Sequence, residues 1–458
     1  MPAEPNAKGP LGRAVLIAYG LPGLPLAALL LPLYVTLPAF YAVDLGLGFF
    51  TVGVVLLLAR FWDVVTDPLI GSLSDRLTTR FGRRRPWLLA GAPVVMVSAG
   101  LLFLPGPDPG PDPGWSDLLV WTMVLYLGAT MILLPYSAWG AELSADYNER
   151  SRIAGWREGL VVVGTLLAAG LPVAVGAERA VALEVIAWTL WIVLPVCLVI
   201  AVRFVPERPA ALPPPLAWRQ GLCVIWRNGP FRRLIAAYFL NGIANGLPAT
   251  LFLLYVEWVL EAPDWSGILL FVYFFCGVAA IPLWLRLSAR WGKHRTWVGA
   301  MVWAALVFAF VPLLGPGDEL WFLAVCVLTG ISLGADLTLP ASMQAEVIDL
   351  DTLRSRQSRA GLFFALWGVA TKLALALAVG IAFPLLALAG LEADPEAGPA
   401  SGLFALAALY SLLPAAIKLA SVALIAGYPI TAARQYRIRR LVEVRAARHR
   451  QAMPADGV

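Results

Sequence analysis

Twelve long apolar stretches follow one another along this chain of 458 residues, and each can cross about 30 Å of hydrocarbon as a helix. Apolar residues make up 60% of the sequence and charged residues 14%, against about 45–50% and about 25% in soluble domains. So much apolar surface does not fit inside one or two soluble cores. The sequence therefore predicts an all-α polytopic membrane protein with twelve transmembrane helices. We expect these near residues 13–40, 49–74, 87–105, 117–142, 154–176, 182–204, 233–259, 265–288, 297–315, 319–343, 360–388 and 402–430.

Lysine and arginine residues indicate how the chain crosses the membrane, because they concentrate on the cytoplasmic side. With the N-terminus inside, nearly all of them fall in the expected cytoplasmic segments, and Arg179 is the only one in the expected outer loops. We therefore expect both termini in the cytoplasm and the chain in the inner (plasma) membrane. The net charge of +5 then reflects these loops and not a nucleic-acid partner, since the charges form no basic domain.

The chain has only two histidines and four cysteines. His294 and His449 lie in basic connectors, and the cysteines form no CxxC pair. These patterns favour small apolar packing residues over a metal centre or a histidine proton relay. We expect no cofactor. The sequence offers no nucleophile motif and no membrane-embedded metal cluster, which argues against an enzyme. A membrane sensor that transports nothing is another functional class to consider, and it would have only the short C-terminal tail to carry a signal.

A repeated loop sequence divides the chain into two halves. Residues 76–87, RLTTRFGRRRPW, reappear 210 residues later as RLSARWGKHRTW at 286–297. Each copy joins the second and third span of its half, which indicates two six-helix bundles of the same topology. We expect an N-terminal bundle over residues 1–204, a Pro- and Arg-rich cytoplasmic linker over 205–232, a C-terminal bundle over 233–430 and a basic cytoplasmic tail over 431–458.

Ionisable residues inside the apolar stretches are the strongest functional signal, because each costs about 2.5–3.5 kcal/mol at the centre of a membrane helix. Arg60, Asp63 and Asp67 share one face of the second span. Two carboxylates one turn apart repel each other unless a cation or a proton neutralises them, and their hard oxygens suit Na⁺. We expect Asp63 and Asp67 to bind a small cation, with the Thr66 hydroxyl beside them. A structural ion-pair stack on Arg60 is the alternative.

Two lysines also lie inside predicted spans. Lys372 in the eleventh span is the expected mobile counter-charge, which pairs with Asp63 or Asp67 when the cation is absent. A lysine that reaches out to the membrane interface is the alternative. Lys418 in the twelfth span has either a packing role or a pathway role.

The remaining buried charges, and tryptophans close to them, are candidates for binding the solute. These residues are Arg157, Glu158, Asp336, Trp139 and Trp367. The charges would hold polar groups of the solute, and the indole rings would stack on a sugar ring. Most tryptophans in such a chain pack or lie at the membrane interface, which is the alternative for both indoles.

A basic loop after the second span predicts a gate at the inner mouth. The spacing Gly71-x-x-x-Asp75-Arg76 lets two helices approach closely, and the arginines that follow can pair with acids at the ends of neighbouring spans. Arginines here also serve the topology. The expected gating residues are Asp75, Arg76, Arg83, Arg84, Arg85, Glu142 and Arg150.

The motif Arg60-x-Trp62-Asp63-x-x-x-Asp67-Pro68-x-x-Gly71-x-x-x-Asp75-Arg76, followed by Gly82-Arg83-Arg84-Arg85-Pro86-Trp87, resembles the glycoside-pentoside-hexuronide:cation symporters of the major facilitator superfamily. Pro135-Tyr136, Glu149-Arg150, Ala345-Glu346-Val347-Ile348-Asp349 and Lys372 are similar to further marks of that family. The resemblance implies the major facilitator fold of two six-helix bundles, acting as a monomer. It also implies that Asp63, Asp67, Thr66 and Thr130 bind the cation, that Lys372 lies close to them, and that Arg157 belongs to the sugar site.

Two departures from the family pattern bear on the solute. Leu133 stands where the family's sugar carriers have an aspartate, and the first span lacks an aspartate that they have there. We expect a secondary active transporter that uses Na⁺ or H⁺ to carry a sugar-like solute by alternating access. Its partners would be a small-molecule solute, the coupling cation and the lipid bilayer. A proton-coupled or lysolipid-like solute transporter on the same scaffold is the alternative, because the family is also similar to lysophospholipid symporters.

Overall fold

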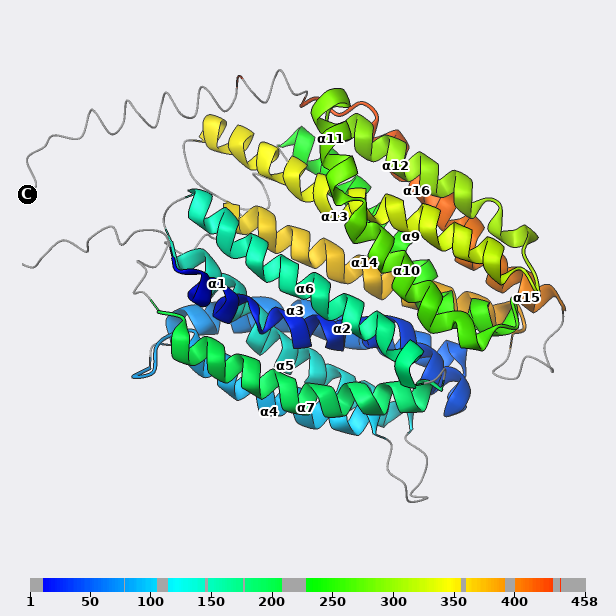
Figure 1. Cartoon of the computed structure of the whole chain (residues 1–458), viewed down its shortest axis with the longest axis horizontal. Coiled ribbons are helices and arrows are strands. Elements are labelled where there is room, and N and C mark those ends of the chain that lie inside the picture. The colour runs from blue at the N-terminus through cyan, green and yellow to red at the C-terminus, as the bar shows by residue number, and fades with distance from the viewer. Residues whose placement is uncertain are drawn as a thin grey trace, which may run out of the picture. The chain divides into compact units, whose positions relative to one another are not determined.

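A computed structural model describes residues 11–77, 79–104, 114–144, 147–175, 178–207, 228–355, 360–391, 400–430 and 437. Over these residues the regular structure is helical, apart from one isolated bridge between Thr79 and Gly82 (Figure 1). Residues 208–227 of the predicted linker and most of the predicted tail lie outside the described residues.

Where the structure describes the first half of the chain, it contains seven α-helices and one short π-helical segment. They are α1 (Arg13–Gly20), α2 (Gly23–Ala39), η1 (Phe40–Asp44), α3 (Phe49–Arg76), α4 (Arg85–Phe103), α5 (Trp115–Glu142), α6 (Tyr147–Val175) and α7 (Arg179–Phe204). Pro22 lies at the break between α1 and α2, where its ring removes a backbone donor. The two helices and η1 together still make a single stretch long enough to cross a membrane.

The second half of the chain is also built from helices. They are α9 (Gly229–Trp258), η2 (Pro263–Trp265), α10 (Ser266–Ala279), α11 (Ile281–Trp291), α12 (Lys293–Phe308), η3 (Val311–Leu313), α13 (Glu319–Ser355), α14 (Ala360–Leu388), α15 (Ala400–Ala407), η4 (Ala408–Leu412) and α16 (Leu413–Ile425). A bend of 41° separates the segment that ends with α10 from α11. Pro282 lies in the first turn of α11, where a proline ends the preceding helix.

The described helices confirm the predicted number of spans. Eleven are long and apolar enough to cross a membrane, and the bent pair of α10 and α11 makes a twelfth. Two boundaries differ clearly from the prediction: α6 begins seven residues before the expected start of the fifth span at 154, and α13 continues for twelve residues beyond the expected end of the tenth span at 343. Hydropathy indicates where the hydrocarbon ends, but a helix continues into water while its backbone hydrogen bonds are kept.

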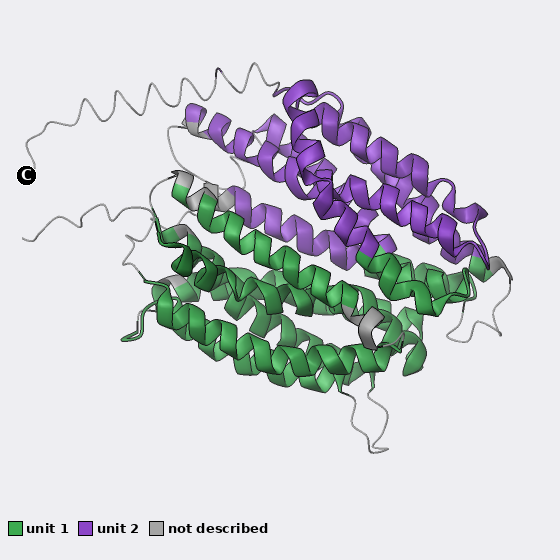
Figure 2. Cartoon of the chain, in the orientation of Figure 1, with its two compact units in different colours: residues 1–213, 249–271, 379–403 green, residues 214–248, 272–378, 404–458 purple. Residues whose placement is uncertain are grey.

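Contacts between residues divide the chain into two compact units (Figure 2). Unit 1 comprises residues 1–213, 249–271 and 379–403, and unit 2 comprises residues 214–248, 272–378 and 404–458. Unit 1 thus holds α1 to α7 together with the last turns of α9, the start of α10 and the end of α14. The domain boundaries predicted at residues 204 and 233 stay a prediction.

Two glycines bring α4 and α5 together in unit 1. A Cβ atom on Gly91 would lie 2.7 Å from Cγ1 of Ile132 and 3.0 Å from the carbonyl oxygen of Gly128. A Cβ on Gly128 would lie 2.9 Å from Val94 and 3.0 Å from Val95. Small residues let membrane helices approach this closely. Because α5 packs on α4 on one side and on α3 on another, these glycines fix the helix that carries Thr130.

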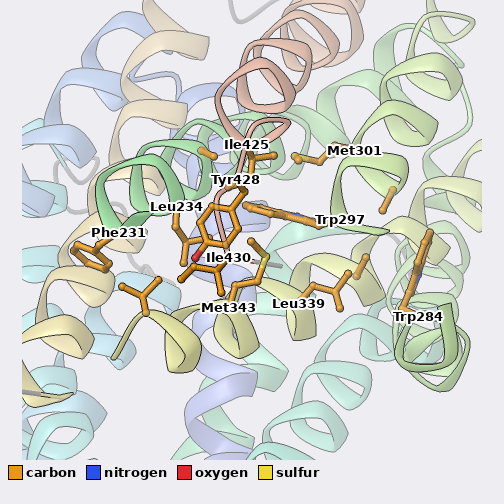
Figure 3. Packing of buried hydrophobic residues seen from close by; sticks show 14 of the residues in the cluster. Phe231, Leu234, Trp284, Trp297, Met301, Leu339, Met343, Ile425, Tyr428 and Ile430 are labelled. Atoms are coloured by element: carbon orange, nitrogen blue, oxygen red, sulfur yellow. The ribbon is translucent and has the colours of Figure 1, made fainter. Parts of the chain in front are cut away.

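The core of unit 2 is a cluster of buried side chains from α9, α11, α12, α13, α14 and α16 and the segment after α16. Ten of them are labelled in Figure 3, with Leu234, Met343, Tyr428 and Ile430 close together near the centre: Phe231, Leu234, Trp284, Trp297, Met301, Leu339, Met343, Ile425, Tyr428 and Ile430. The indole nitrogens in this cluster have partners: Trp284 donates to the carbonyl of Ile331 at 2.6 Å, and Trp297 donates to Asp336. The core therefore reaches a charged side chain of α13.

Candidate functional site

Two carboxylates of α3 converge on one hydroxyl of α5. Oγ1 of Thr130 lies 3.1 Å from Oδ1 of Asp63 and 2.9 Å from Oδ1 of Asp67. Asp63, Thr66 and Thr130 are buried. The spacing of four residues puts both acids on one face of α3, and the packing of α5 on α3 brings the hydroxyl to them.

The oxygens of this group need a positive charge among them. A threonine hydroxyl has one proton, so it can donate to only one of the two carboxylates. The other close contact then joins two oxygen lone pairs, and two ionised carboxylates this close repel each other. A proton, or a cation bound by the three oxygens, relieves both. The arrangement is thus a candidate cation site of hard oxygen ligands.

Arg60 contributes one fixed positive charge to this region. Its Nη1 lies 3.2 Å from Oδ2 of Asp63, and its guanidinium lies over the rings of Tyr34 at 4.7 Å and Tyr126 at 4.0 Å. Cation–π contacts favour the charged guanidinium inside a buried site. One arginine balances one carboxylate, so Arg60 with the two acids has a net charge of −1. Tyr34 and Tyr126 were not among the residues predicted from the sequence, since neither side chain carries a charge.

The other predicted cation-site residues are placed as follows. The Thr66 hydroxyl donates to the backbone carbonyl of Asp63 at 3.1 Å, one turn back on its own helix. Lys372 lies on α14 within unit 2 and is half-buried, whereas Asp63 and Asp67 lie in unit 1. The pairing of Lys372 with these acids stays a prediction. Over the described residues, no group of three or more His, Cys, Asp or Glu side chains is arranged to hold a metal.

Three of the predicted solute-binding residues lie in unit 1. Arg157 and Glu158 on α6 pair with each other, with Nη2 of Arg157 at 2.5 Å from Oε1 of Glu158. Nη1 of Arg157 also donates to Oγ of Ser137 at 3.2 Å. Trp139 is fully buried and donates to the carbonyl of Pro206 at 3.1 Å. Glu158 is the exposed member of this set, and the role of all three residues in solute binding stays a prediction.

The other two predicted solute-binding residues lie in unit 2. Trp367 on α14 stacks on Tyr238 of α9, with ring centroids 3.8 Å apart. The Tyr238 hydroxyl is 2.9 Å from that of Thr371. Asp336 on α13 accepts hydrogen bonds from Trp297 at 2.7 Å and from other polar side chains. Unit 2 thus contains the aromatic pair of Tyr238 and Trp367 and the carboxylate of Asp336.

The predicted gate is a charged cluster in unit 1. Oε1 of Glu142, at the end of α5, lies 2.6 Å from Nη2 of both Arg83 and Arg84. Glu207 accepts hydrogen bonds from the backbone nitrogens of Arg83 and Arg84 and lies 3.8 Å from Nε of Arg85. Arg76 is exposed at the end of α3. The side chains of Asp75 and Arg150 lie outside what the structure describes. Glu207 was missed because its hydrogen bonds are to the backbone nitrogens of Arg83 and Arg84, which leave no charge pattern in the sequence.

A second ion-pair cluster, at the predicted outer side, was also missed. Arg179 at the start of α7 donates to both carboxylate oxygens of Asp44, at 2.8 and 2.9 Å. Its Nη1 donates to Glu257, at the end of α9, at 2.7 Å. The signal for it was present in the sequence, since Arg179 is the single basic residue of the predicted outer loops.

Comparisons with known proteins place this geometry in context. The model of a family described as "MFS/sugar transport protein" matches residues 18–432. Human sodium-dependent lysophosphatidylcholine symporter 1 is 25% identical over 420 residues, covering 84% of this chain and 77% of that protein. The inner membrane symporter YicJ of Escherichia coli is 26% identical over 394 residues, covering 83% of this chain and 84% of that protein.

Two solved structures share the fold at low sequence identity. The D-xylose-proton symporter superposes with a TM-score of 0.66 at 12% identity, covering 91% of this chain and 97% of that chain. The nucleoside transporter NupG superposes with a TM-score of 0.65 at 11% identity, covering 92% and 100%. The arrangement of helices is therefore that of major facilitator transporters.

Proposed function

Since the chain belongs to the MFS/sugar transport protein family, whose model matches nearly all of it, we propose that it is an Na⁺-coupled symporter of a sugar-like solute. It is a multi-pass membrane transporter of the symporter type and not an enzyme, and transporters of this kind need no cofactor. In this proposal it acts as a monomer in the inner membrane, with both termini in the cytoplasm.

The observation that supports cation coupling is the contact of Thr130 with both Asp63 and Asp67. Na⁺ bound to these oxygens removes the repulsion between the carboxylates and so stabilises the arrangement of α3 and α5. A solute that binds better to this arrangement is bound more tightly when Na⁺ is present, and by linkage it tightens Na⁺ binding equally. The relatives named as sodium-dependent symporters favour Na⁺ over H⁺ as the coupling ion.

Lys372 is the proposed counter-charge in the cation-free state. An ammonium between the carboxylates performs the same electrostatic task as Na⁺, so the two compete. Binding of Na⁺ then releases Lys372. The solute site in this proposal uses Arg157, Glu158, Asp336, Trp139 and Trp367, with the stacked pair of Tyr238 and Trp367 offering an aromatic face to a sugar ring.

Alternating access needs ion pairs that close one end of the pathway at a time. The cluster of Glu142 with Arg83 and Arg84 is the proposed inner gate. Asp75, Arg76, Arg85 and Arg150 are proposed to belong to it. The cluster of Arg179 with Asp44 and Glu257 is its proposed outer counterpart.

Uptake into proteoliposomes tests the coupling. We expect an inward Na⁺ gradient to drive uptake by the wild type. Asp63→Asn and Thr130→Ala should abolish accumulation but keep exchange, whereas Thr130→Ser, which keeps the hydroxyl, should retain uphill uptake. Thr122→Ala is the matched control, because Thr122 is a buried threonine of the same helix away from the acids. Uphill uptake by Asp63→Asn would refute the coupling role.

A lysolipid is the second candidate solute, favoured by the relatives named as lysophosphatidylcholine symporters. A thermal-shift screen of the purified protein against sugars, uronates and lysolipids, with and without Na⁺, separates the candidates. We expect stabilisation by a sugar or uronate that grows with Na⁺ concentration. Na⁺-dependent stabilisation by lysolipids alone would transfer the proposal to that solute class.

A further inference from the structure

A buried ammonium of unit 2 lies inside a group of side-chain oxygens. Lys418 on α16 is 2% exposed. Its Nζ donates to Oδ1 of Asn241 at 2.8 Å and to Oδ1 of Asn245 at 2.7 Å, and Oδ2 of Asp336 lies at 3.5 Å. An ammonium group has three N–H donors, and these three oxygens account for all of them.

Two of the three residues have further hydrogen bonds that do not involve the lysine. Nδ2 of Asn245 donates to Oδ2 of Asp336 at 2.9 Å, and Nε1 of Trp297 donates to Oδ1 of the same carboxylate at 2.7 Å. Asn241 and Asn245 lie one turn apart on α9, so their amides project from one face. Four helices (α9, α12, α13 and α16) therefore contribute to one polar network inside the bundle.

The chemistry of this group is that of a cation site. Amide and carboxylate oxygens are the hard ligands that small cations prefer. With the lysine in place the network contains one carboxylate and one ammonium, so its net charge is zero. Without the ammonium, Asp336 would keep the N–H groups of Asn245 and Trp297 but would lose its positive charge, which is costly for a buried carboxylate in a membrane interior.

We propose that Asn241, Asn245 and Asp336 form an oxygen cage for a small cation, and that Lys418 fills it permanently as a cation tethered to the chain. The cage therefore has the ligands of an ion site but exchanges no ion with solution. Asp336 keeps its counter-ion through the whole transport cycle and draws nothing from the ion gradient. The proposal concerns unit 2 alone and does not depend on which ion occupies the site of Asp63 and Asp67.

Truncation of the lysine converts the cage into a site for a free cation. We expect Lys418→Ala to lower the melting temperature of the purified protein by roughly 5–10 °C in Na⁺-free choline buffer. Methylammonium chloride at matched ionic strength should restore several degrees, because it supplies the missing N–H donors and fits the space of the lost side chain. Tetramethylammonium, which has no N–H group, should not. The wild type should respond to neither.

Two control variants separate the cage from a general loss of stability. Ser421→Ala, one turn from Lys418 on α16, removes a buried hydrogen bond to the carbonyl of Ala237 without touching the cage, so its loss of stability should not respond to methylammonium. Lys418→Ala/Asp336→Asn lacks the carboxylate and should lose the rescue. A folded Lys418→Ala that methylammonium does not stabilise, or a rescue that persists without the carboxylate, would overturn the proposal.

A second comparison applies if Lys418→Ala does not fold. Lys418→Met leaves Asp336 as an uncompensated charge, and Asp336→Asn leaves the ammonium uncompensated. Lys418→Met/Asp336→Asn has neither charge, so we expect it to melt at a higher temperature than either single variant. A double variant no more stable than the singles would show that the two groups do not neutralise each other, and the proposal would fail.

Discussion

Arg179 and Glu257 form an ion pair, with 2.7 Å between Nη1 of the arginine and Oε2 of the glutamate. The same guanidinium holds Asp44 through two more N–H groups. Close by in unit 1, the ring of Phe49 packs edge-on against Trp258 at 5.7 Å and Phe383 at 5.3 Å. Arg179 thus joins the start of α7 to the end of α9 beside an aromatic cluster.

Loss of this ion pair should favour opening of the predicted outer side. We expect Arg179→Gln to increase the rate at which a membrane-impermeant maleimide labels a cysteine placed at Trp258, by several-fold. Glu184→Gln, an acid on the same helix that accepts a hydrogen bond from Trp188, should leave the rate unchanged. Equal labelling of Arg179→Gln and the parent would contradict a gating role.

Arg60 should compete electrostatically with the coupling cation. Its removal leaves the two carboxylates with one positive charge fewer, and at these separations the lost interaction corresponds to roughly a tenfold change in cation affinity or more. We expect Arg60→Gln to shift the Na⁺ midpoint for thermal stabilisation to lower concentration. Tyr126→Phe, which keeps the ring over the guanidinium, is the control. A midpoint shifted to higher Na⁺ would mean that Arg60 organises the site.

Glu142 should be important for stability as well as gating, because it is the carboxylate partner of Arg84, which is only 3% exposed. Breaking a buried ion pair by removing one partner costs about 3–5 kcal/mol. We expect Glu142→Gln to lower the melting temperature markedly. Arg80→Ala removes an exposed guanidinium that lies 4.8 Å from the ring centroid of Phe81, a contact worth about 0.5–1 kcal/mol at an exposed site, and should change it little. Similar effects of both variants would contradict this assignment.

The close packing of α4 against α5 should leave no room for a side chain at position 91. A Cβ there meets Ile132 and the backbone of Gly128 within about 3 Å, so Gly91→Val forces the helices apart and moves Thr130. We expect loss of most folded protein by size-exclusion chromatography, and loss of Na⁺-dependent stabilisation in what remains. Gly155→Ala on α6, where no heavy atom lies within 4 Å of the new Cβ, should behave as wild type.

The sequence predicted most of what is local along a helix. Apolar length gave the twelve spans, and the period of the helix put Asp63 and Asp67 on one face. The sequence could not predict where α13 ends, because hydropathy indicates which residues lie in the hydrocarbon and not where the backbone hydrogen bonds of a helix stop.

Contacts between helices distant in sequence were harder to predict. The rings around Arg60 carry no charge, and Glu207 binds backbone atoms of the Arg83 loop, so neither leaves a pattern in the sequence. Lys418 was recognised as a buried charge, but its partners Asn241 and Asn245 are neutral and lie 177 and 173 residues away. Thr130 was predicted as a cation ligand only from the family resemblance, since a threonine in an apolar stretch gives no functional signal by itself.

The length of α13 has a mechanical consequence. Its 37 residues extend over about 55 Å, well beyond the thickness of the hydrocarbon, and its projecting end is tied to the start of α12 by an ion pair of 2.6 Å between Lys293 and Glu346. In such a long helix, a small change of tilt near Pro340 becomes a larger displacement at Ser355. A fluorophore attached near Ser355 would therefore report any such tilt as a change in signal that can be followed in real time.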